Sequence, residues 1–334
     1  MEILYIQDYD AHRRVASGMM PSHHLFGMDM LVDHYCNDCA VIKSEFGGGR
    51  IDFITAGHLS LIGIVKLYFI AQKYDVVYDV LNVVSRYFGL ANKWCMFRPK
   101  LVTFLHHPPF GKQLSLAKSD INIFFSPQLL NEGKIHVTDN RLLVCNRWYP
   151  DVEWYKRIST NMNYKKKFDY LDNGKTSRDH NMFIRCMRSM PGKMGCIVTD
   201  KNHIPSEYKD GDNVVLFLQD KPNDLTMVEL CMQSKVMVIP LHQTHLAVFG
   251  PIGNTSYMDA IALGMPVVTN DYAAFADEII SYKLGEVYSF NDKCMVEAMK
   301  EVINNYEIFK RNMNQFAINH NIVAYSQKIQ EMIF

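Results

Sequence analysis

The sequence predicts an α/β protein made of two doubly wound, Rossmann-like domains. Short apolar strand-like runs alternate with helical patterns from one end of the chain to the other. The runs are continuously apolar, which is typical of strands that lie in a parallel sheet with helices on both faces. The series restarts near the middle of the 334 residues, and a domain usually has about 100–200 residues. We therefore predict domains over 1–160 and 161–310, with a functional cleft between them.

In the first half, apolar runs and helical periodicity define the expected elements. Strands are predicted at 3–6, 40–42, 76–81, 101–105, 121–125 and 142–145. Helices are predicted around 22–32, at 59–72, after 81 and at 148–158. The glycine-rich stretch 46–50 lacks the spacing of a phosphate-binding loop and is interpreted as a flexible loop.

The second half repeats the alternation after a polar, basic linker at 161–167. Strands are predicted at 168–171, 195–198, 214–218, 236–239 and 266–269, with helices at 181–190, 225–232 and 256–263. From 293 onward the chain is expected to be helical. In its last helix, 322–334, apolar residues recur every three or four positions at Ile322, Tyr325, Ile329 and Ile333, which predicts a packing face.

Composition excludes several classes of protein. The chain has 35 basic and 35 acidic residues, a formal net charge of zero, and 48% apolar residues. These values exclude a disordered chain and argue against binding nucleic acid through bulk charge. The start does not resemble a secretory signal, and no run is long enough to span a membrane. We expect a cytoplasmic protein.

The eight cysteines are scattered, several of them inside apolar runs, which is typical of a reducing compartment. Cys36 and Cys39 form a Cys-x-x-Cys pair next to His34. A zinc site needs a second pair and a thioredoxin-like motif needs a following helix, whereas this pair leads into a strand. Packing is the favoured interpretation.

The loop after the first strand contains Gly18, His23 and His24. Gly18 permits a tight turn, and Ser22 is expected to cap a helix whose N-terminus faces the cleft. The loop lacks the Gly-x-Gly-x-x-Gly spacing of a dinucleotide-binding fold.

Two further loops carry candidate charges. His106 and His107 follow the strand at 101–105, where they are either catalytic groups or a surface pair. Gly174, Lys175 and Arg178 follow the strand at 168–171. Gly174 allows close backbone approach, and both cations are expected to face one phosphate, unless this is a capped turn with solvated charges.

The most informative segment is 249–269. A glycine loop ends at Gly253, and a short helix capped by Thr255 or Ser256 follows, carrying Asp259 and stopping at Gly264. The backbone amides at Asn254, Thr255 and Ser256 are candidates to hold a pyrophosphate, with Asp259 accepting from a ribose hydroxyl.

These residues resemble the GT-B-fold glycosyltransferases, especially the retaining group that builds bacterial glycans. The stretch Asp259-Ala260-Ile261-Ala262-Leu263-Gly264-Met265-Pro266-Val267-Val268 resembles that group's signature. The loop of Gly174, Lys175 and Arg178 resembles its diphosphate clamp, and the loops at Gly18 and His106 resemble its first loop and its sugar-contacting loop. The resemblance also implies that the C-terminal segment, 311–334, crosses back to the first domain.

Two positions depart from that pattern. The group has two glutamates eight residues apart, but here Asp259 stands at the second position and Pro251 at the first. The first glutamate contacts the donor sugar near the reacting carbon. Its replacement leaves open whether the reaction retains or inverts configuration.

The resemblance implies a hexosyltransferase-like enzyme of bacterial surface polysaccharide synthesis. It would transfer a sugar from a nucleotide-diphosphate sugar to a glycan or lipid-linked glycan, with no cofactor and no metal. In an inverting reaction His106 or His107 would be the base. In a retaining one the histidine would orient the sugar or acceptor.

Other interpretations remain open. A non-catalytic GT-B homologue that binds a nucleotide sugar, or scaffolds a synthesis complex, would explain the missing glutamate. A Rossmann oxidoreductase would need a dinucleotide fingerprint, which the sequence lacks. Lys165, Lys166 and Lys167 are either a solvated linker or a peripheral contact with anionic lipid or acceptor.

Overall fold

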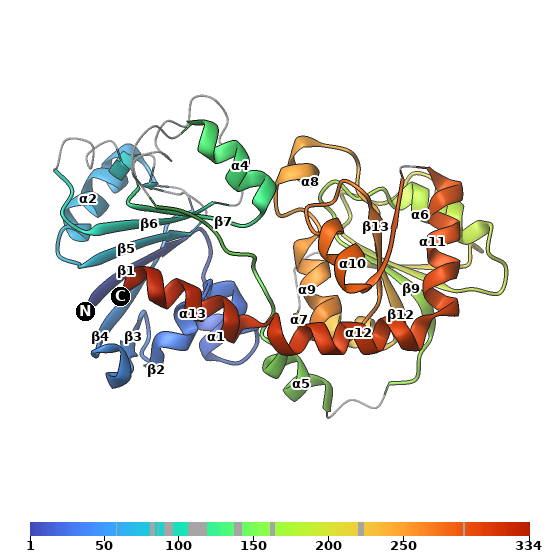
Figure 1. Ribbon diagram of the computed structural model, residues 1–334, viewed down its shortest axis with the longest axis horizontal. Helices are drawn as coiled ribbons and strands as arrows, with labels where there is room; N and C mark the ends of the chain where they lie inside the picture. The colour runs from blue at the N-terminus through green and yellow to red at the C-terminus, as the bar shows by residue number, and fades with distance from the viewer. Residues whose placement is uncertain are drawn as a thin grey trace. The chain divides into compact units, whose positions relative to one another are not determined.

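The chain divides into two compact units (Figure 1). Unit 1 comprises Met1–Trp148 and Ile322–Phe334, and unit 2 comprises Tyr149–Asn321. The sequence placed the boundary at 160, whereas α5 (Val152–Thr160) belongs to unit 2. The computed structural model describes residues 1–57, 59–80, 84–85, 87–89, 96–105, 119–136, 142–160, 164–219, 224–289 and 291–334.

Unit 1 is built on an eight-stranded sheet of order β2-β3-β4-β1-β5-β6-β7-β8. Its strands are β1 (Glu2–Gln7), β2 (Val32–Tyr35), β3 (Cys39–Ile42), β4 (Gly49–Thr55), β5 (Val76–Val80), β6 (Lys100–Leu105), β7 (Ile121–Phe124) and β8 (Leu142–Cys145). The strands from β4 to β8 in this order run parallel, while β3 is antiparallel to β4 and β2 to β3. The predicted parallel sheet is therefore extended by an antiparallel hairpin.

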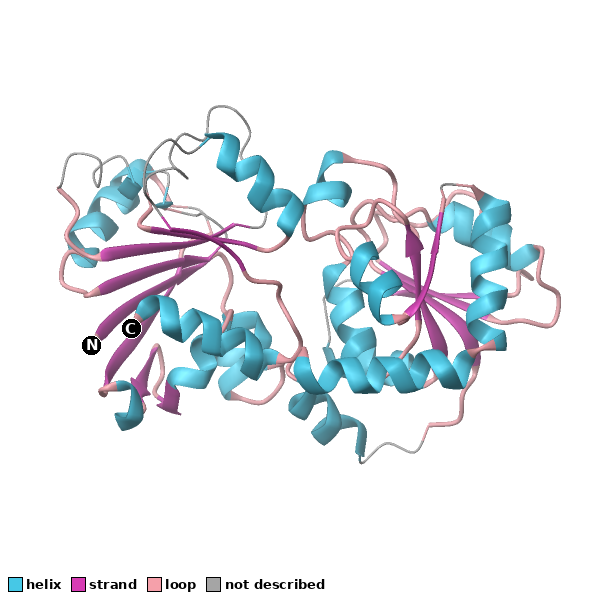
Figure 2. Ribbon diagram, in the orientation of Figure 1, coloured by secondary structure: helices cyan, strands magenta, loops and turns pink. Residues whose placement is uncertain are grey.

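Helical elements lie on both faces of this sheet (Figure 2). They are α1 (Ala11–Ala16), η1 (Ser22–Leu25), η2 (Met28–Leu31), η3 (Ser44–Phe46), α2 (Leu61–Ala71), α4 (Pro127–His136) and α13 (Ile322–Ile333). On one face α2 packs against Leu4, Val77 and Leu101 of three central strands. On the other face α13 brings Tyr325 against Phe104 of β6.

Two expectations for unit 1 are wrong. The segment 22–32 is not one helix, because Gly27 adopts φ +90° and separates the two short 3₁₀ turns η1 and η2. The N-cap of η1 is Pro21, and Ser22 is the first residue of this turn. The stretch expected to be a flexible loop ends in β4, a strand that lies next to β1 in the middle of the sheet.

Unit 2 is built on a parallel six-stranded sheet of order β11-β10-β9-β12-β13-β14. Its strands are β9 (Phe168–Asn173), β10 (Gly195–Thr199), β11 (Val214–Leu218), β12 (Ser234–Ile239), β13 (Val267–Asn270) and β14 (Gly285–Tyr288). This is the doubly wound order, in which the chain changes direction across the sheet between β9 and β12. The predicted strands of this half are confirmed, and β14 completes the sheet.

The other helices of unit 2 cover both faces of this sheet (Figure 2). They are α6 (His180–Arg188), α7 (Asp224–Met232), α8 (His245–Phe249), α9 (Asn254–Ala262), α10 (Ala276–Tyr282), α11 (Asp292–Asn304) and α12 (Tyr306–Asn319). One apolar core joins α9 and α10 to the sheet, and a second joins α6 and α11 to its other face.

The C-terminal segment is shared between the units, because α12 belongs to unit 2 and α13 to unit 1. The four apolar residues that define the predicted face of α13 are all buried. Lys100 Nζ donates to the carbonyl of Met332 at 2.7 Å, and Asn146 Nδ2 donates to that of Tyr325 at 3.1 Å. The last helix therefore packs on the first unit, whereas residues 311–321 of the predicted C-terminal segment belong to unit 2.

Candidate functional site

The strand order of unit 2 directs attention to the carboxyl ends of β9 and β12, where open parallel sheets bind ligands. The loop after β9 reaches the end of β12, because Arg178 and Leu241 form an antiparallel bridge. The start of α9 also lies there, since Ser256 Oγ donates to the carbonyl of Asn173 at 2.8 Å. We call the residues 172–180, 241–242 and 253–259 the β9–α9 site.

The site contains a buried acid–histidine pair. Asp172 is completely buried near the end of β9, and its Oδ2 lies 2.6 Å from Nδ1 of His180 at the start of α6. The other carboxylate oxygen, Oδ1, lies 3.9 Å from Nε of Arg178. The sequence indicated Arg178 in this segment but not the partners that surround it.

Arg178 is buried, with 3% of its side chain exposed. Its Nε donates to the carbonyl of Asn173 at 3.0 Å and its Nη2 to Ser256 Oγ at 2.9 Å. Burial lowers the pKa of Arg178 to about 10, against the opposing effects of Asp172 and Tyr288. The guanidinium thus stays charged at neutral pH and links the end of β9 to the first turn of α9.

Gly174 makes room for this guanidinium. Its φ is +132°, and a Cβ built on it would lie 2.9 Å from both Nε and Nη2 of Arg178. A larger residue here would meet two costs, the backbone conformation and the displaced arginine. The close approach predicted for Gly174 is confirmed, but the group that approaches is a side chain of the protein.

Lys175 lies in different surroundings. Its side chain is half exposed, and Nζ lies 3.5 Å from Asp200 Oδ2, just after β10. The two cations therefore do not point together in this structure, since Arg178 is turned inward and Lys175 outward. Their joint contact with one phosphate stays a prediction.

The helix α9 begins at Asn254, with Gly253 as its N-cap at φ +89°. A Cβ on Gly253 would lie 3.0 Å from Ile239 Cγ2 and 3.1 Å from the ring of Phe275, so the helix start packs tightly on β12. Neither Thr255 nor Ser256 caps the helix, which corrects the sequence interpretation, because no side chain takes that role. The amides of the first turn are thus left without a side-chain cap, as at a site for an anion.

Asp259 lies one turn further along α9 and is partly buried. Its Oδ1 accepts from Tyr155 OH at 2.6 Å, and Asn173 Nδ2 donates to Oδ2 at 3.4 Å. Desolvation raises the pKa of Asp259 to about 7, although the hydrogen bond from Tyr155 acts in the opposite direction. Tyr155 lies in α5, and nothing in the sequence pattern connected it to this acid.

Several buried polar atoms at this edge of the sheet have no hydrogen-bond partner. They belong to the ends of strands and the starts of α6 and α9: Asp172 Oδ1, Arg178 Nη1, His180 Nε2, Thr199 Oγ1, Asn254 Nδ2, Asn270 Nδ2 and Tyr288 OH. Native proteins rarely leave such atoms unpaired unless water or a ligand satisfies them. These atoms make the carboxyl edge of the unit 2 sheet the candidate site.

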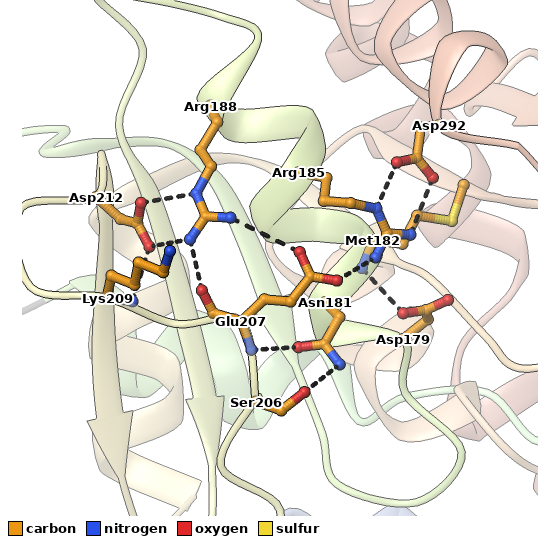
Figure 3. A network of polar contacts seen from close by, with 10 residues as sticks. All are labelled: Asp179, Asn181, Met182, Arg185, Arg188, Ser206, Glu207, Lys209, Asp212 and Asp292. Carbon is orange, nitrogen blue, oxygen red and sulfur yellow. Dashed lines mark hydrogen bonds and ion pairs between the residues drawn. The ribbon is translucent and has the colours of Figure 1, made fainter.

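A polar network holds α6 in place from its N-cap to its last turn (Figure 3). Arg185 donates to Asp292 at 2.6 Å and to Glu207 at 2.7 Å, and Arg188 binds Asp212 at 2.8 Å. Asp179 caps the helix by accepting from the amide of Met182 at 2.9 Å. These contacts fix the helix that carries His180 and follows Arg178.

In unit 1, Gly18 adopts φ +74° after α1, as expected for a tight turn. His23 is buried, and Trp148 Nε1 donates to its carbonyl at 2.7 Å. His24 Nδ1 lies 3.0 Å from Tyr9 OH. Burial lowers the pKa of both imidazoles, that of His24 to about 3, so both are neutral at pH 7. Their role towards an acceptor stays a prediction.

His106 and His107 lie outside the described residues. Beside the end of β6, which precedes them, a chain of buried hydroxyls runs from Asp79 Oδ2 through Ser85 and Thr103 to Ser119. Its links measure 2.5, 2.6 and 2.7 Å. These bonds hold Thr103 and Ser119 in place, and these two residues precede and follow His106 and His107 in the sequence.

The predicted packing role of the Cys-x-x-Cys pair is only half correct. Cys36 is exposed and Cys39 partly exposed, because the pair closes the turn between β2 and β3, where the amide of Cys36 donates to the carbonyl of Cys39 at 2.8 Å. Cys186, Cys196 and Cys231 are buried, as expected of small apolar residues. Within the described part of the chain, no group of three or more metal-binding side chains is placed to hold an ion.

The lysine run at 165–167 is not uniformly solvated. Lys166 donates to the carbonyl of Ser234, and burial lowers its pKa to about 8. All three lysines are exposed overall, but the ammonium end of Lys166 is the one that bonds the protein. The middle lysine therefore anchors the start of β9 to the start of β12.

No family model and no curated protein matches the sequence. Solved structures do match over nearly the whole chain. A sucrose-phosphate synthase from Thermosynechococcus elongatus has a TM-score of 0.68 at 12% identity, covering 99% of this chain and 98% of that one. HepE from Anabaena, solved with UDP-glucose, gives 0.65 at 12% identity, covering 100% and 99%. WaaG, a glycosyltransferase of lipopolysaccharide biosynthesis, gives 0.58 at 12% identity, covering 99% of each.

These likenesses show the fold. The chain has the GT-B fold of two Rossmann-like units, with a mainly parallel sheet in unit 1, a parallel sheet in unit 2 and a C-terminal helix that returns to the first unit. The identity is too low for the comparisons to carry over any residue's role. The predicted fold class is confirmed, and the activity has to be argued from the site.

Proposed function

We propose that this protein is a glycosyltransferase that moves a sugar from a nucleotide-diphosphate sugar to a glycan or lipid-linked glycan. The observation that carries the proposal is the β9–α9 site. There an uncapped helix start, a buried guanidinium and unpaired buried donors meet at the switch point of a doubly wound sheet. HepE, which shares the fold, was solved with UDP and with UDP-glucose.

The leaving diphosphate is the group that needs stabilising in such a reaction. Negative charge grows on it as the bond to the anomeric carbon breaks, and fixed positive dipoles lower the barrier. We assign this task to the amides of Thr255 and Ser256 at the N-terminus of α9, where the helix dipole is positive; the amide of Asn254, also predicted for this role, donates to the carbonyl of Pro251 at 2.9 Å. Arg178 holds that turn in place, and half-exposed Lys175 supplies a charge at its rim, with no metal ion required.

Asp259 is proposed to accept hydrogen bonds from the ribose. Each carboxylate oxygen has two lone-pair sites, so the bonds from Tyr155 and Asn173 leave capacity for a ligand hydroxyl. With its pKa near 7, Asp259 accepts best above neutral pH.

The acceptor side is assigned to unit 1, through the loop of Gly18, His23 and His24. His106 or His107 would take the acceptor proton if the reaction inverts configuration, and would orient the sugar if it retains it. The glycan acceptor, the hexosyl class of the sugar, the bacterial surface polysaccharide pathway and the cytoplasmic location are proposed with the family resemblance as their support.

A second candidate is a GT-B homologue that binds a nucleotide sugar without turning it over. One observation favours it. The loop 249–256, which approaches the donor position in the proposal, contains no acidic residue, and Pro251 stands where related enzymes have a glutamate.

Thermal-shift measurements against UDP, GDP and their sugar conjugates test both candidates, followed by an assay of donor hydrolysis. The enzyme proposal expects stabilisation by a nucleotide diphosphate and slow release of free sugar. Binding without hydrolysis or transfer to any acceptor would favour the second candidate. No stabilisation by any nucleotide would contradict both.

A further inference from the structure

The helix α2 in unit 1 has an unusual distribution of apolar residues. Ser60 caps it by accepting from the amide of Gly63 at 3.2 Å. Its inner side packs Ile64, Leu67 and Ala71 against the sheet. The helix is thus anchored, and its other side should be polar if it only met water.

That other side is apolar instead. Leu61 and Ile62 are each 70% exposed, Val65 is 50% exposed and Phe69 is 66% exposed. With 3.6 residues per turn, these four fall within about 100° of the helix circumference. Met96, 63% exposed, lies alongside, because Tyr68 OH and Gln72 Nε2 donate to its carbonyl at 2.6 and 2.9 Å. We call Leu61, Ile62, Val65, Phe69 and Met96 the α2 face.

The charged side chains of α2 and of the turn after it are cationic as far as residue 73, and the exposed acid Asp75 follows. Residues 59–73 contain two charged side chains, Lys66 and Lys73, and no acid. Both lysines are exposed; Lys66 lies at about 140° on the same helical wheel, directly beside the apolar stripe, and Lys73 lies in the turn that follows the helix, which ends at Ala71. Arg98 is also exposed, and its amide donates to Gln72 Oε1 at 3.1 Å. Three cations therefore border the face.

Together these features fit one kind of surface. A contiguous exposed apolar patch marks an interaction site, and an apolar stripe edged by lysines matches the boundary between acyl chains and anionic headgroups. A second copy of the chain is a poorer match, because a two-fold interface pairs each patch with itself and would bring the lysines together. We propose that the α2 face docks unit 1 onto a bilayer that contains anionic lipid.

The helix lies on the bilayer and does not cross it. Its eleven residues span about 16 Å, roughly half the hydrocarbon thickness of a membrane. In the described part of the chain, no helix is long and apolar enough to span a bilayer. Ile62 and Phe69 enter the acyl boundary, while Lys66, Lys73 and Arg98 meet lipid phosphates. The docking does not depend on the transfer reaction proposed above.

Sedimentation of the full chain with vesicles tests the proposal. The wild-type chain is expected to bind vesicles of phosphatidylcholine with about a quarter phosphatidylglycerol, and to bind pure phosphatidylcholine weakly. Phe69→Glu and Ile62→Glu should each lower the partition coefficient by about tenfold or more, because a charge replaces a buried apolar group. Lys66→Glu should lower it by at least about fivefold, in a salt-dependent way.

Ile280→Glu is the matched control. Ile280 is an isoleucine of similar exposure, 63%, on α10 of unit 2. This variant should bind vesicles as the wild type does, and unchanged thermal midpoints should show that all variants are folded. Arg178→Ala should also bind vesicles normally, which separates the docking from the nucleotide site.

Three results would overturn the proposal. The first is no binding to anionic vesicles. The second is an equal loss in Ile280→Glu and Phe69→Glu. The third is a lipid-free dimer, seen by analytical ultracentrifugation, that Phe69→Glu dissociates, since that would make the α2 face an interface between two copies.

Discussion

The helices α9 and α2 depart in opposite ways from the usual partition of apolar and polar groups. At the start of α9, a charged arginine and several polar atoms are buried without full pairing. Along α2, large apolar side chains are exposed. Neither arrangement is expected from folding stability alone, because buried polar groups are usually paired and large apolar side chains are usually buried. The two proposals account for both departures, by anion binding at unit 2 and by membrane docking at unit 1.

The largest effect is expected from Arg178→Ala, which removes the buried charge from the start of α9. Nucleotide-diphosphate affinity, measured by calorimetry, should fall by about 1.5–3 kcal/mol, because the charge-assisted hydrogen bonds to Asn173 and Ser256 that position the first turn of α9 are lost. Arg188→Ala is the matched control, because Arg188 pairs with Asp212 on the outer side of α6. Equal affinities in the two variants would remove Arg178 from the site.

A smaller effect is expected from Gly174→Ala compared with Gly211→Ala. Both glycines have positive φ, at +132° and +92°, so each variant should lose about 1 kcal/mol of unfolding free energy. A Cβ at Gly174 meets Arg178, whereas a Cβ at Gly211 meets nothing within 4 Å. Only Gly174→Ala should therefore also weaken UDP binding. Similar UDP affinity in both variants would show that the position of the guanidinium does not matter.

The pH dependence of nucleotide binding should depend on Asp259, whose pKa is raised to about 7 by burial. Below that pH the carboxyl is protonated and accepts less well, so UDP affinity should fall by up to about tenfold per pH unit. The free energy of unfolding changes with pH in the opposite direction to the UDP affinity. Because the folded-state pKa is raised, this group destabilises the fold as pH rises from about 4 to about 7.

The Asp259→Asn variant tests the pH dependence of UDP affinity and the pH dependence of folding stability. Titrations of UDP between pH 5.5 and 8 should become flatter in this variant, and so should its pH profile of thermal stability. A wild-type affinity that does not change over this range would separate Asp259 from the ribose.

The smallest effect is expected from Lys175→Ala. Lys175 is half exposed and lies 3.5 Å from Asp200, so unfolding free energy should change by less than about 1 kcal/mol. UDP affinity should fall a few-fold at low salt and hardly at all at high salt. A large, salt-independent loss would show that Lys175 turns inward when the ligand binds.

Much of the fold could be predicted because buried parallel strands are continuously apolar. That signal identified β9, β10, β12 and β13, and with them the order of the second unit. It failed at β4, where Gly49, Arg50 and Asp52 interrupt the apolar pattern of a strand that pairs with β3 and β1. It also failed at η1 and η2, because Gly27 interrupts a helix-like spacing.

The site was predictable only as a set of segments. Glycines and charged residues after strands located the loops of Gly174 and Gly253. Whether a charged side chain contacts the protein or a ligand, however, depends on its burial. The sequence could not tell that Arg178 turns inward while Lys175 stays outside. Nor could it join Tyr155 to Asp259, since those residues are 104 positions apart and meet only through folding. The exposure of the α2 face was equally hidden, because an apolar helix is normally buried.

A crystal structure of the full chain with bound UDP tests the central claim most directly. The account predicts that the diphosphate lies at the N-terminus of α9, with a phosphate oxygen within hydrogen-bond distance of the amide of Thr255 or Ser256. It further predicts that the guanidinium of Arg178 lies beneath that turn. A diphosphate bound elsewhere, with the start of α9 and Arg178 untouched, would contradict it.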